Sequence, residues 1–396
     1  MKTAGIIAEY NPFHNGHAYH IEETRKKTEA DYIIAVMSGS FVQRGTPAIC
    51  DKHLRAETAL QNGVDLVLEL PVSYAVGSAE IFSRGAVEIL DRLGIVNALS
   101  FGAETDDLEE LSAIADFLLQ EPEEYKSVLQ KNLAQGQNFA KARAAAIPKI
   151  HAEIFSSPNA ILGIEYLKAL KRRHSRIKPF VIQRKGAGYN DHKLFTPVRE
   201  TGFSSASSIR QELFKTQSRG SAPVFLSEAV PAEMQTVLTA LCQTHALLSE
   251  DDFSELLHYK ILTQSEEELC LCPSVSPDLA RRIKRHQYRF KTFSTFADLV
   301  KCKNFTHSRI RRALCEILLD LKEPEPIRHV RVLGCRKTAL PLLSAIAENG
   351  TIPLVTSLSK GDCFWQNDIV YDMILSHKKK APMTPEPSKG MKIVEL

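Results

Sequence analysis

Two histidines near the start of the chain carry its strongest chemical signal, in the run His14-Asn15-Gly16-His17. Imidazoles three residues apart in a first helical turn share one face and can donate to phosphate oxygens together. The unpaired N–H groups of a helix N-terminus also favour phosphate, and Gly16 lets a nucleobase lie flat against the backbone. The run predicts a nucleotide site; two ordinary histidines near a turn are the alternative.

A second run, Ser204-Ser205-Ala206-Ser207-Ser208-Ile209-Arg210, combines hydroxyl groups with a basic residue at the start of a predicted helix. Hydroxyl and backbone N–H groups at such a place bind pyrophosphate well, and Arg210 can neutralise its charge. A plain serine N-cap is the alternative interpretation. The presence of the histidine run favours the functional one.

The elements that must position these runs alternate between strand and helix. Strands are expected at residues 3–8, 32–37, 66–70, 98–101 and 179–183, and helices at 17–27, 52–62, 78–93, 106–119, 122–134, 138–146, 161–173 and 207–214. Such alternation predicts a Rossmann-like α/β fold with a parallel sheet. Ligands of an open parallel sheet bind at the carboxyl ends of its strands, where the histidine run lies.

The sequence also indicates a division of the chain. Residues 1–216 form the predicted nucleotide-binding domain, and the Ser, Gly and Pro of residues 217–223 mark a boundary. Residues 224–377 are predicted to be mostly helical, with a strand-like piece at 330–333, and residues 378–396, rich in Lys, Pro and Ser, to be a flexible tail.

Charge is distributed unevenly although the formal net charge is only +3. Residues 281–337 hold 16 Lys and Arg against 5 Asp and Glu, which is typical of a surface that binds a polyanion. The residues that would follow nucleic-acid phosphates are Phe305, His307, Arg309, Arg311, Arg312, Arg281, Arg282, Lys284 and Arg285. A solvated charged helix face is the alternative.

Several classes of protein are excluded or disfavoured. No stretch approaches eighteen consecutive apolar residues, so we expect no membrane span. The N-terminus lacks the pattern of a signal peptide, and we expect a cytoplasmic protein. The eight cysteines lack the spacing of a zinc or redox motif, which predicts neutral thiols and no protein-bound metal site.

The motifs also carry a family resemblance. His14-Asn15-Gly16-His17 resembles the HxGH signature of the HUP-type nucleotidyltransferase superfamily, which includes class I aminoacyl-tRNA synthetases, and Ser207-Ser208-Ile209-Arg210 resembles its Ser/Thr-x-Ile-Arg signature. Longer stretches are more specific, and with them nearly the whole chain resembles the bacterial tRNA(Met) cytidine acetate ligase family. They are residues 7–20, 37–45, 62–71, 157–166 and 184–189.

This resemblance implies an ATP-dependent ligase. Such an enzyme activates acetate as acetyl-adenylate and transfers the acetyl group to the wobble cytidine of elongator tRNA(Met), forming N4-acetylcytidine. His14 and His17 would be catalytic, Ser208 and Arg210 would belong to the ATP site, and Mg²⁺ would bridge the phosphates. The family's ATP site falls on Ile7, Ala8, Glu9, Tyr10, Asn11, Pro12, Phe13, His14, Asn15, Gly16, His17, Ala18, Tyr19, His20, Gly102, Asn159 and Arg184.

Simpler interpretations exist for some of these positions. Gly102 could be a turn glycine, Asn159 a helix N-cap, and Arg184 part of a solvated basic loop. The stretch 38–45 either lines the acetate or cytidine pocket or is a structural loop.

Two other functions use the same features. A small-metabolite adenylyltransferase of the pantetheine-phosphate or nicotinamide-nucleotide type shares the motifs but would not need a basic helical region. A non-catalytic RNA-binding protein would not need the intact pair of histidines. Without the resemblance, the residues indicate ATP α-phosphate chemistry with an RNA partner; acetate and the modified base rest on the resemblance alone.

Overall fold

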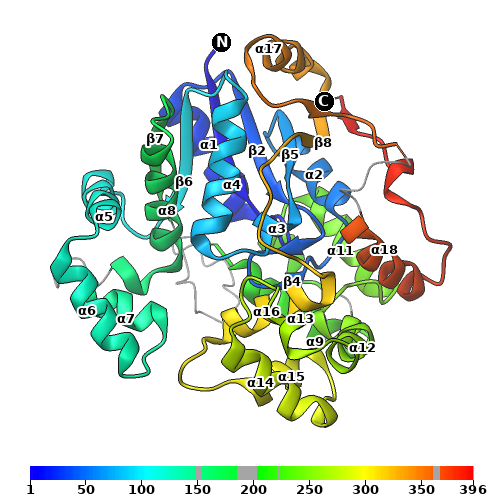
Figure 1. Ribbon diagram of the computed structural model, residues 1–396. Helices are drawn as coiled ribbons and strands as arrows, with labels where there is room; N and C mark the ends of the chain where they lie inside the picture. Colours follow the sequence, from blue (N-terminus) through cyan, green and yellow to red (C-terminus); the bar gives the residue numbers. More distant parts are fainter. Residues whose placement is uncertain (149–153, 185–202, 222, 360–365, 396) are drawn as a thin grey trace.

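The computed structural model describes residues 1–148, 154–184, 203–221, 223–359 and 366–395. Its centre is a sheet in the order β10-β8-β5-β2-β1-β6-β7, with β9 paired to β8 (Figure 1). Five adjacent strands run parallel: β1 (Thr3–Ala8), β2 (Tyr32–Ser38), β5 (Leu66–Leu70), β6 (Ala98–Ala103) and β7 (Lys178–Gln183). They are the five predicted strands, which confirms the α/β class with a parallel sheet.

Helices follow the strands closely. In the first part of the chain they are α1 (Asn15–Thr28), α2 (Lys52–Gln61), α3 (Val72–Ala75), α4 (Ala79–Arg92), α5 (Leu108–Gln120), α6 (Glu123–Ala134), α7 (Phe139–Ala146), α8 (Pro158–Arg172) and α9 (Ala206–Ser218). A short hairpin, β3 (Phe41–Val42) with β4 (Thr46–Pro47), follows β2. Helix α1 begins two residues earlier than predicted because His14 caps it.

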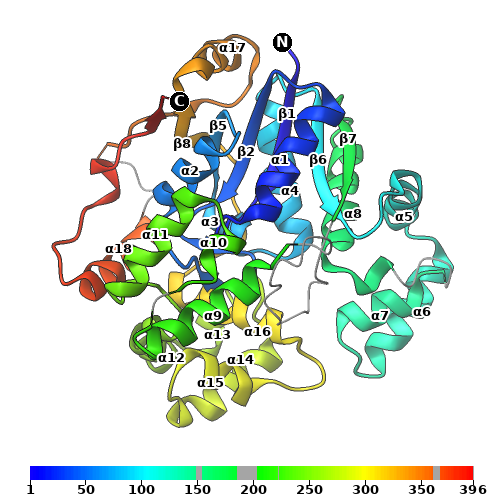
Figure 2. The same ribbon diagram turned by 180° about the vertical axis from the view of Figure 1, so that it is seen from behind.

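Helices cover both faces of the sheet because successive strand residues, which point to opposite faces, are both apolar. On β2, Ile34 and Val36 pack toward α4 and α8, whereas Ile33 and Ala35 pack toward α1 and α2. Figure 1 shows α4 and α8 on one side of the sheet, and Figure 2 shows α1, α2 and α11 on the other.

The segment after residue 223 is mostly helical, as predicted. Its helices are α10 (Leu226–Ala229), α11 (Ala232–Gln243), α12 (Ser254–Thr263), α13 (Glu266–Leu269), α14 (Pro277–His286), α15 (Phe293–Val300), α16 (His307–Leu319), α17 (Pro341–Asn349) and α18 (Gln366–Lys379). Phe253, Phe293 and Phe296 form the centre of a second core, which also contains Phe41 of β3. In the part of the chain described, no helix has the length and apolarity needed to cross a membrane.

Three strands from this segment complete the sheet. β8 (Val330–Arg336), with the short β9 (Leu354–Val355) beside it, pairs antiparallel with β5, and β10 (Lys392–Val394) pairs parallel with β8. The predicted strand-like piece at 330–333 is therefore a sheet strand. Where the sequence predicts a flexible tail, the structure has an edge strand; the predicted division of the chain into domains itself stays a prediction.

Buried ion pairs attach this tail to the sheet. The ammonium group of Lys52, 1% exposed, lies 2.7 Å from a carboxylate oxygen of Glu69, 2.6 Å from Asp368 and 3.0 Å from Glu386. Glu386, 1% exposed, also pairs with Arg331 of β8. Because removal of one member of such a cluster leaves uncompensated buried charge, these contacts hold the last residues in one place.

Candidate active site

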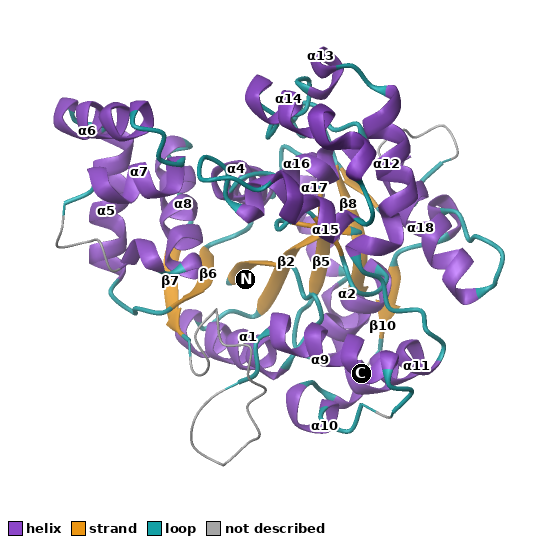
Figure 3. Cartoon of the chain, turned by 90° about the horizontal axis from the view of Figure 1, so that it is seen from below, coloured by secondary structure: helices purple, strands orange, loops and turns teal. Residues whose placement is uncertain are grey.

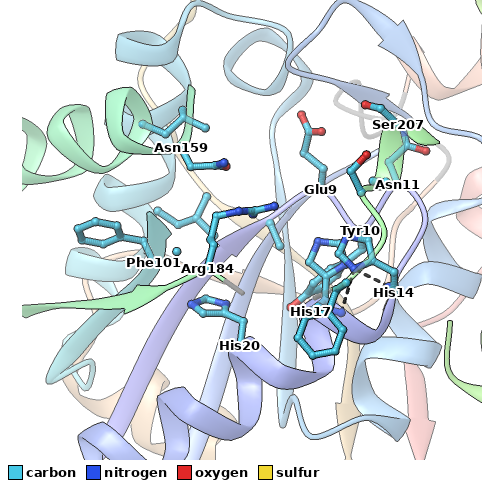
Figure 4. A pocket seen from close by; sticks show the side chains of 18 of the residues that line it. Glu9, Tyr10, Asn11, His14, His17, His20, Phe101, Asn159, Arg184 and Ser207 are labelled. Carbon is cyan, nitrogen blue, oxygen red and sulfur yellow. Dashed lines mark hydrogen bonds between the residues drawn. The ribbon is translucent and has the colours of Figure 1, made fainter. Parts of the chain in front are cut away.

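A pocket opens at the carboxyl ends of β1, β6 and β7, beside the first turns of α1, α8 and α9 (Figure 3 shows the end of the sheet from this side, and Figure 4 the pocket). Most of the residues that the sequence predicts for the nucleotide site line it. They are Ile7, Ala8, Glu9, Tyr10, Asn11, His14, Gly16, His17, Tyr19, His20, Gly102, Asn159, Arg184 and Arg210.

The two histidines form the floor of this pocket with a fixed orientation. His14 is the N-cap of α1: its Nδ1 accepts from the backbone N–H of Gly16 at 3.1 Å, and its own backbone N–H donates to Nδ1 of His17 at 3.2 Å. The rings are stacked with centroids 3.7 Å apart. Since both Nδ1 atoms accept, the neutral rings carry their protons on Nε2, which leaves two N–H donors.

Burial keeps these rings neutral. It lowers the pKa of His14 to about 3, with Arg184 and Arg210 adding to the effect, and it lowers that of His17 well below its ordinary value, with His14 and Arg184 adding. Burial and Arg184 lower the pKa of His20 to about 4. Near neutral pH these imidazole rings are therefore neutral: they can donate a hydrogen bond but carry no positive charge.

Arg184 supplies charge on one side of the pocket. It follows β7, its backbone N–H bonds Ala103 of β6 at 2.9 Å, and its side chain lies over Gly102. A Cβ on Gly102 would come 3.4 Å from Cγ of Arg184, an ordinary van der Waals contact, so this side chain alone does not require a glycine there. Asn159 donates to Glu104 at 2.7 Å, and it is Ser157, not Asn159, that caps α8.

The hydroxyl-rich turn at α9 supplies charge on the opposite side. Ser205 is the N-cap of α9, and Ser204, Ser205 and Ser207 line the pocket. Arg210 donates to the carbonyl of Asn11 at 2.5 Å and to the hydroxyl of Ser207 at 3.3 Å. The second signature is thereby tied to the turn that follows β1, and an anion in the pocket meets a helix N-terminus and a guanidinium together.

A buried arginine holds the strand ends beneath the pocket. Arg55 of α2 is 0% exposed and donates to the carbonyl groups of Glu9 at 2.7 Å, of Ser38 at 3.1 Å and of Gly39 at 2.5 Å. No carboxylate pairs with it among the residues described. Its fork of donors therefore fixes the backbone where β1 and β2 end.

Some predicted residues lie outside the pocket lining. Phe13 is a core residue, Asn15 donates to the carbonyl of Glu228 at 2.8 Å, and the hydroxyl of Ser208 donates to the carbonyl of Ser205 at 2.8 Å. Pro12 follows a cis peptide bond and Ala18 packs against the core. Of the Ser-Ser pair at 207–208, it is Ser207 that faces the pocket.

The lining also includes Ser204, Ser205, Ala206 and Ser207 of the predicted hydroxyl-rich run. Other lining residues were not among the predicted set, and they are Gln43, Arg44, Phe82, Phe101, Leu162, Tyr166, Ile182, Gln183 and Phe203. The aromatic and aliphatic members form an apolar wall suited to a nucleobase or a methyl group, but in sequence they are indistinguishable from core residues. Gln43 and Arg44 lie in the stretch 38–45, whose role the sequence leaves open.

Comparisons with known proteins agree with this geometry. The family model described as HIGH Nucleotidyl Transferase matches residues 1–384, so the fold and the site define a nucleotidyltransferase of the HIGH class. Curated tRNA(Met) cytidine acetate ligases from Thermoanaerobacter sp. and Clostridium kluyveri are 41% identical over 372 residues and 39% identical over 379 residues; each alignment covers 91% of this chain and 90% of the relative. The chain belongs to the tRNA(Met) cytidine acetate ligase family.

Solved structures give the same result at the level of the fold. The crystal structure of Thermotoga maritima TmcAL (apo, form I) has 28% sequence identity to this chain and superposes with a TM-score of 0.88. The form II crystal structure of that protein, bound with alpha-thio ATP, has a TM-score of 0.84. Each match covers 100% of both chains.

Proposed function

We propose that this enzyme activates acetate with ATP and transfers the acetyl group to the wobble cytidine of elongator tRNA(Met), acting in the cytoplasm. The observation that carries the proposal is the pair of neutral imidazoles at the N-terminus of α1. Their ring centroids are 3.7 Å apart, and each Nδ1 accepts a hydrogen bond from a backbone N–H group. Family membership supplies the substrates: the relatives are named for acetate, cytidine and tRNA(Met), and the neighbour's title names an ATP analogue.

In the first step an acetate oxygen attacks the α-phosphorus of ATP in line with the bond to the β-phosphate. That P–O bond breaks, pyrophosphate leaves, and acetyl-adenylate forms. Negative charge on the phosphate oxygens increases in the transition state, and the Nε2–H groups of His14 and His17 would stabilise it. Arg184 and Arg210, which line the same pocket, would neutralise the remaining phosphates.

In the second step the exocyclic amine of cytidine attacks the carbonyl carbon of the mixed anhydride. The bond to the adenylate oxygen breaks, AMP leaves, and the amine loses a proton. The helix N-terminus and the arginines that hold the phosphate of the adenylate would also stabilise departing AMP.

Magnesium fits this site as an ion held mainly by the triphosphate. The described residues contain no group of three or more His, Cys, Asp or Glu side chains arranged for a metal, but Mg²⁺ needs only one or two carboxylates beside substrate phosphates. Glu9 lines the pocket and is the side chain that would contribute one. The bound ion would offset phosphate charge during attack.

The proposal is tested by mixing the enzyme, ATP and radiolabelled acetate with and without tRNA(Met). We expect acetate-dependent exchange of pyrophosphate into ATP without tRNA, and label on the tRNA when it is present. Omission of acetate is the control. Adenylylation of a small phosphate such as pantetheine phosphate, with no label on tRNA, would support the adenylyltransferase alternative instead, and absence of any turnover would support a binding protein.

A further inference from the structure

The loop between β3 and β4 connects the pocket to helix α16. Gly45 has a φ of +70°, and a Cβ at this position would lie 2.4 Å from the backbone nitrogen of Arg312 and 2.5 Å from the carbonyl carbon of Arg311. Only glycine allows both the backbone conformation and this approach. The loop is therefore packed directly on the backbone of α16.

The same loop forms part of the pocket. Gln43 and Arg44 line it, and the backbone N–H of Gln43 donates to a carboxylate oxygen of Glu9 at 2.8 Å. Glu9 directly follows β1 and precedes the histidine run. A rigid path of two contacts thus leads from the basic helix α16, through the loop, to the residues beside His14.

Positive charge gathers where the loop, α9 and α16 meet. Burial lowers the pKa of Arg44, the carboxylate of Glu9 opposes this effect, and Arg311 adds to it more weakly. Burial lowers the pKa of Arg210 to about 10, with Arg44 and, more weakly, Arg311 adding. Glu9 and Glu250 oppose these effects on Arg210, and Arg311 pairs with Glu250 at 2.5 Å. Like charges this close to one another favour binding of an additional anion.

The position of Arg311 indicates which anion this is. Its side chain is 27% exposed, it belongs to α16, and it is not part of the pocket lining. The Nε of the neighbouring Arg312 is buried and has no hydrogen-bond partner among the described residues, and Glu316 attracts its guanidinium. Arg309 lies over the ring of Phe305 at 5.1 Å and donates to the carbonyl of Ser274 at 3.2 Å. Arg311 lies on the helix against which the loop carrying Arg44 packs, so a phosphate chain that enters the pocket along α16 would meet both arginines.

We propose that Arg44 and Arg311 bind the tRNA backbone phosphate next to the reacting cytidine and so place its base in the pocket. The inference rests on the proposed function. The ATP phosphates belong to a different set of groups, namely His14, His17, Arg184 and Arg210. Arg44 and Arg311 are positioning residues for the second step. The contact between Gly45 and the backbone of α16 fixes the position of the loop that carries Arg44 relative to Arg311.

The experiment separates the two steps. Acetate-dependent pyrophosphate exchange without tRNA reports adenylate formation, and acetyl transfer at varied tRNA concentration reports the KM for tRNA. For Arg311→Gln we expect the KM for tRNA to rise about tenfold, because one phosphate contact is lost. The rate of pyrophosphate exchange should fall much less, so that the factor by which the KM rises is at least about five times the factor by which the exchange rate falls. Arg44→Gln should behave alike, and Arg311→Lys should restore most of the affinity because the charge returns.

Two further variants distinguish phosphate binding from structural damage. Glu250→Gln breaks the same ion pair but keeps the cation, so the KM for tRNA should stay level or fall. Lys26→Gln removes an exposed positive charge from the last turn of α1, the end of that helix away from the pocket, and should leave the KM for tRNA unchanged.

Three results would overturn the inference. Equal losses in exchange and transfer for Arg311→Gln and Arg44→Gln would assign these arginines to the ATP phosphates. A raised KM for tRNA in Glu250→Gln would assign the ion pair a structural role. If none of the arginine variants changes the KM for tRNA, the tRNA does not bind at Arg44 and Arg311. Each of these differs from failure of the proposed function, in which wild-type enzyme shows no acetate-dependent exchange.

Discussion

The buried neutral state of His14 predicts a measurable dependence of stability on pH. In the unfolded chain an imidazole has a pKa of about 6.5, whereas burial lowers the pKa of His14 in the folded protein to about 3. Below pH 6.5 the unfolded ring therefore binds a proton that the folded ring does not. The free energy of unfolding consequently falls as the pH falls from 6.5 toward 3, and above pH 6.5 the ring causes no such loss.

The size of this effect follows from the two pKa values. Between pH 7 and pH 5 the unfolded ring becomes almost fully protonated while the folded ring stays neutral, which costs about 2 kcal/mol of unfolding free energy at about 1.4 kcal/mol per pKa unit. His14→Asn removes this proton, and Asn is a favourable N-cap residue that keeps an acceptor for the N–H of Gly16.

The assay is urea unfolding of wild type and His14→Asn at pH 7 and pH 5. We expect the loss of stability between the two pH values to be about 2 kcal/mol smaller in the variant. His14→Gln, a poorer cap, is the control: it should be less stable at both pH values but show the same reduced pH dependence. An identical pH dependence in wild type and both variants would refute the neutral, buried histidine.

The remaining predictions concern groups that support the site. Arg55→Met should destabilise the fold by about 3 kcal/mol or more in thermal unfolding, because the carbonyl groups at the ends of β1 and β2 lose their buried donors. Glu386→Gln should cost a similar amount, since Lys52 and Arg331 lose a buried counter-charge; retention of wild-type stability would mean that the tail is not anchored there. Arg210→Lys should lower pyrophosphate exchange about tenfold, because an ammonium group cannot bond Asn11 and Ser207 in fork geometry; wild-type exchange would exclude that role.

The parallel half of the sheet could be predicted from the sequence because each of its strands is a continuous apolar run followed by a helix of clear periodicity. For the same reason the carboxyl ends of β1, β6 and β7 could be assigned to one edge, which brings Glu9, Gly102 and Arg184 together although they are far apart in the chain. His14 and His17 were visible because their spacing has few structural explanations.

The far edge of the sheet could not be predicted in this way. β8 and β10 pair through backbone hydrogen bonds with strands distant in sequence, and the residues before β10 are rich in Lys, Pro and Ser. That composition resembles a solvated tail, but its charges are used in buried pairs, such as Lys389 with Asp372 at 2.7 Å. Burial of charge depends on tertiary partners and leaves no local pattern in the sequence.

The basic helices give a mixed result of the same kind. Arg282 and Lys284, predicted to follow tRNA phosphates, donate to carbonyl groups of the helical region: Arg282 to Val300 at 2.6 Å, and Lys284 to Ile261 at 2.8 Å. Arg311 and Arg312, in contrast, lie against the loop that lines the pocket. The charge of these residues in the sequence did not distinguish the arginines near the pocket from those that bond the helical region. The difference arises because α16, and not α14, contacts the loop at Gly45.

The most direct test of the account is acetate-dependent pyrophosphate exchange by the double variant His14→Ala, His17→Ala, compared with wild type and with each single variant. Loss of one aligned donor is expected to lower the rate by about 10² to 10³, and loss of both should abolish measurable exchange while ATP still binds through Arg184 and Arg210. Exchange at the wild-type rate in the double variant would contradict the claim that this pair of neutral imidazoles stabilises the reacting phosphate.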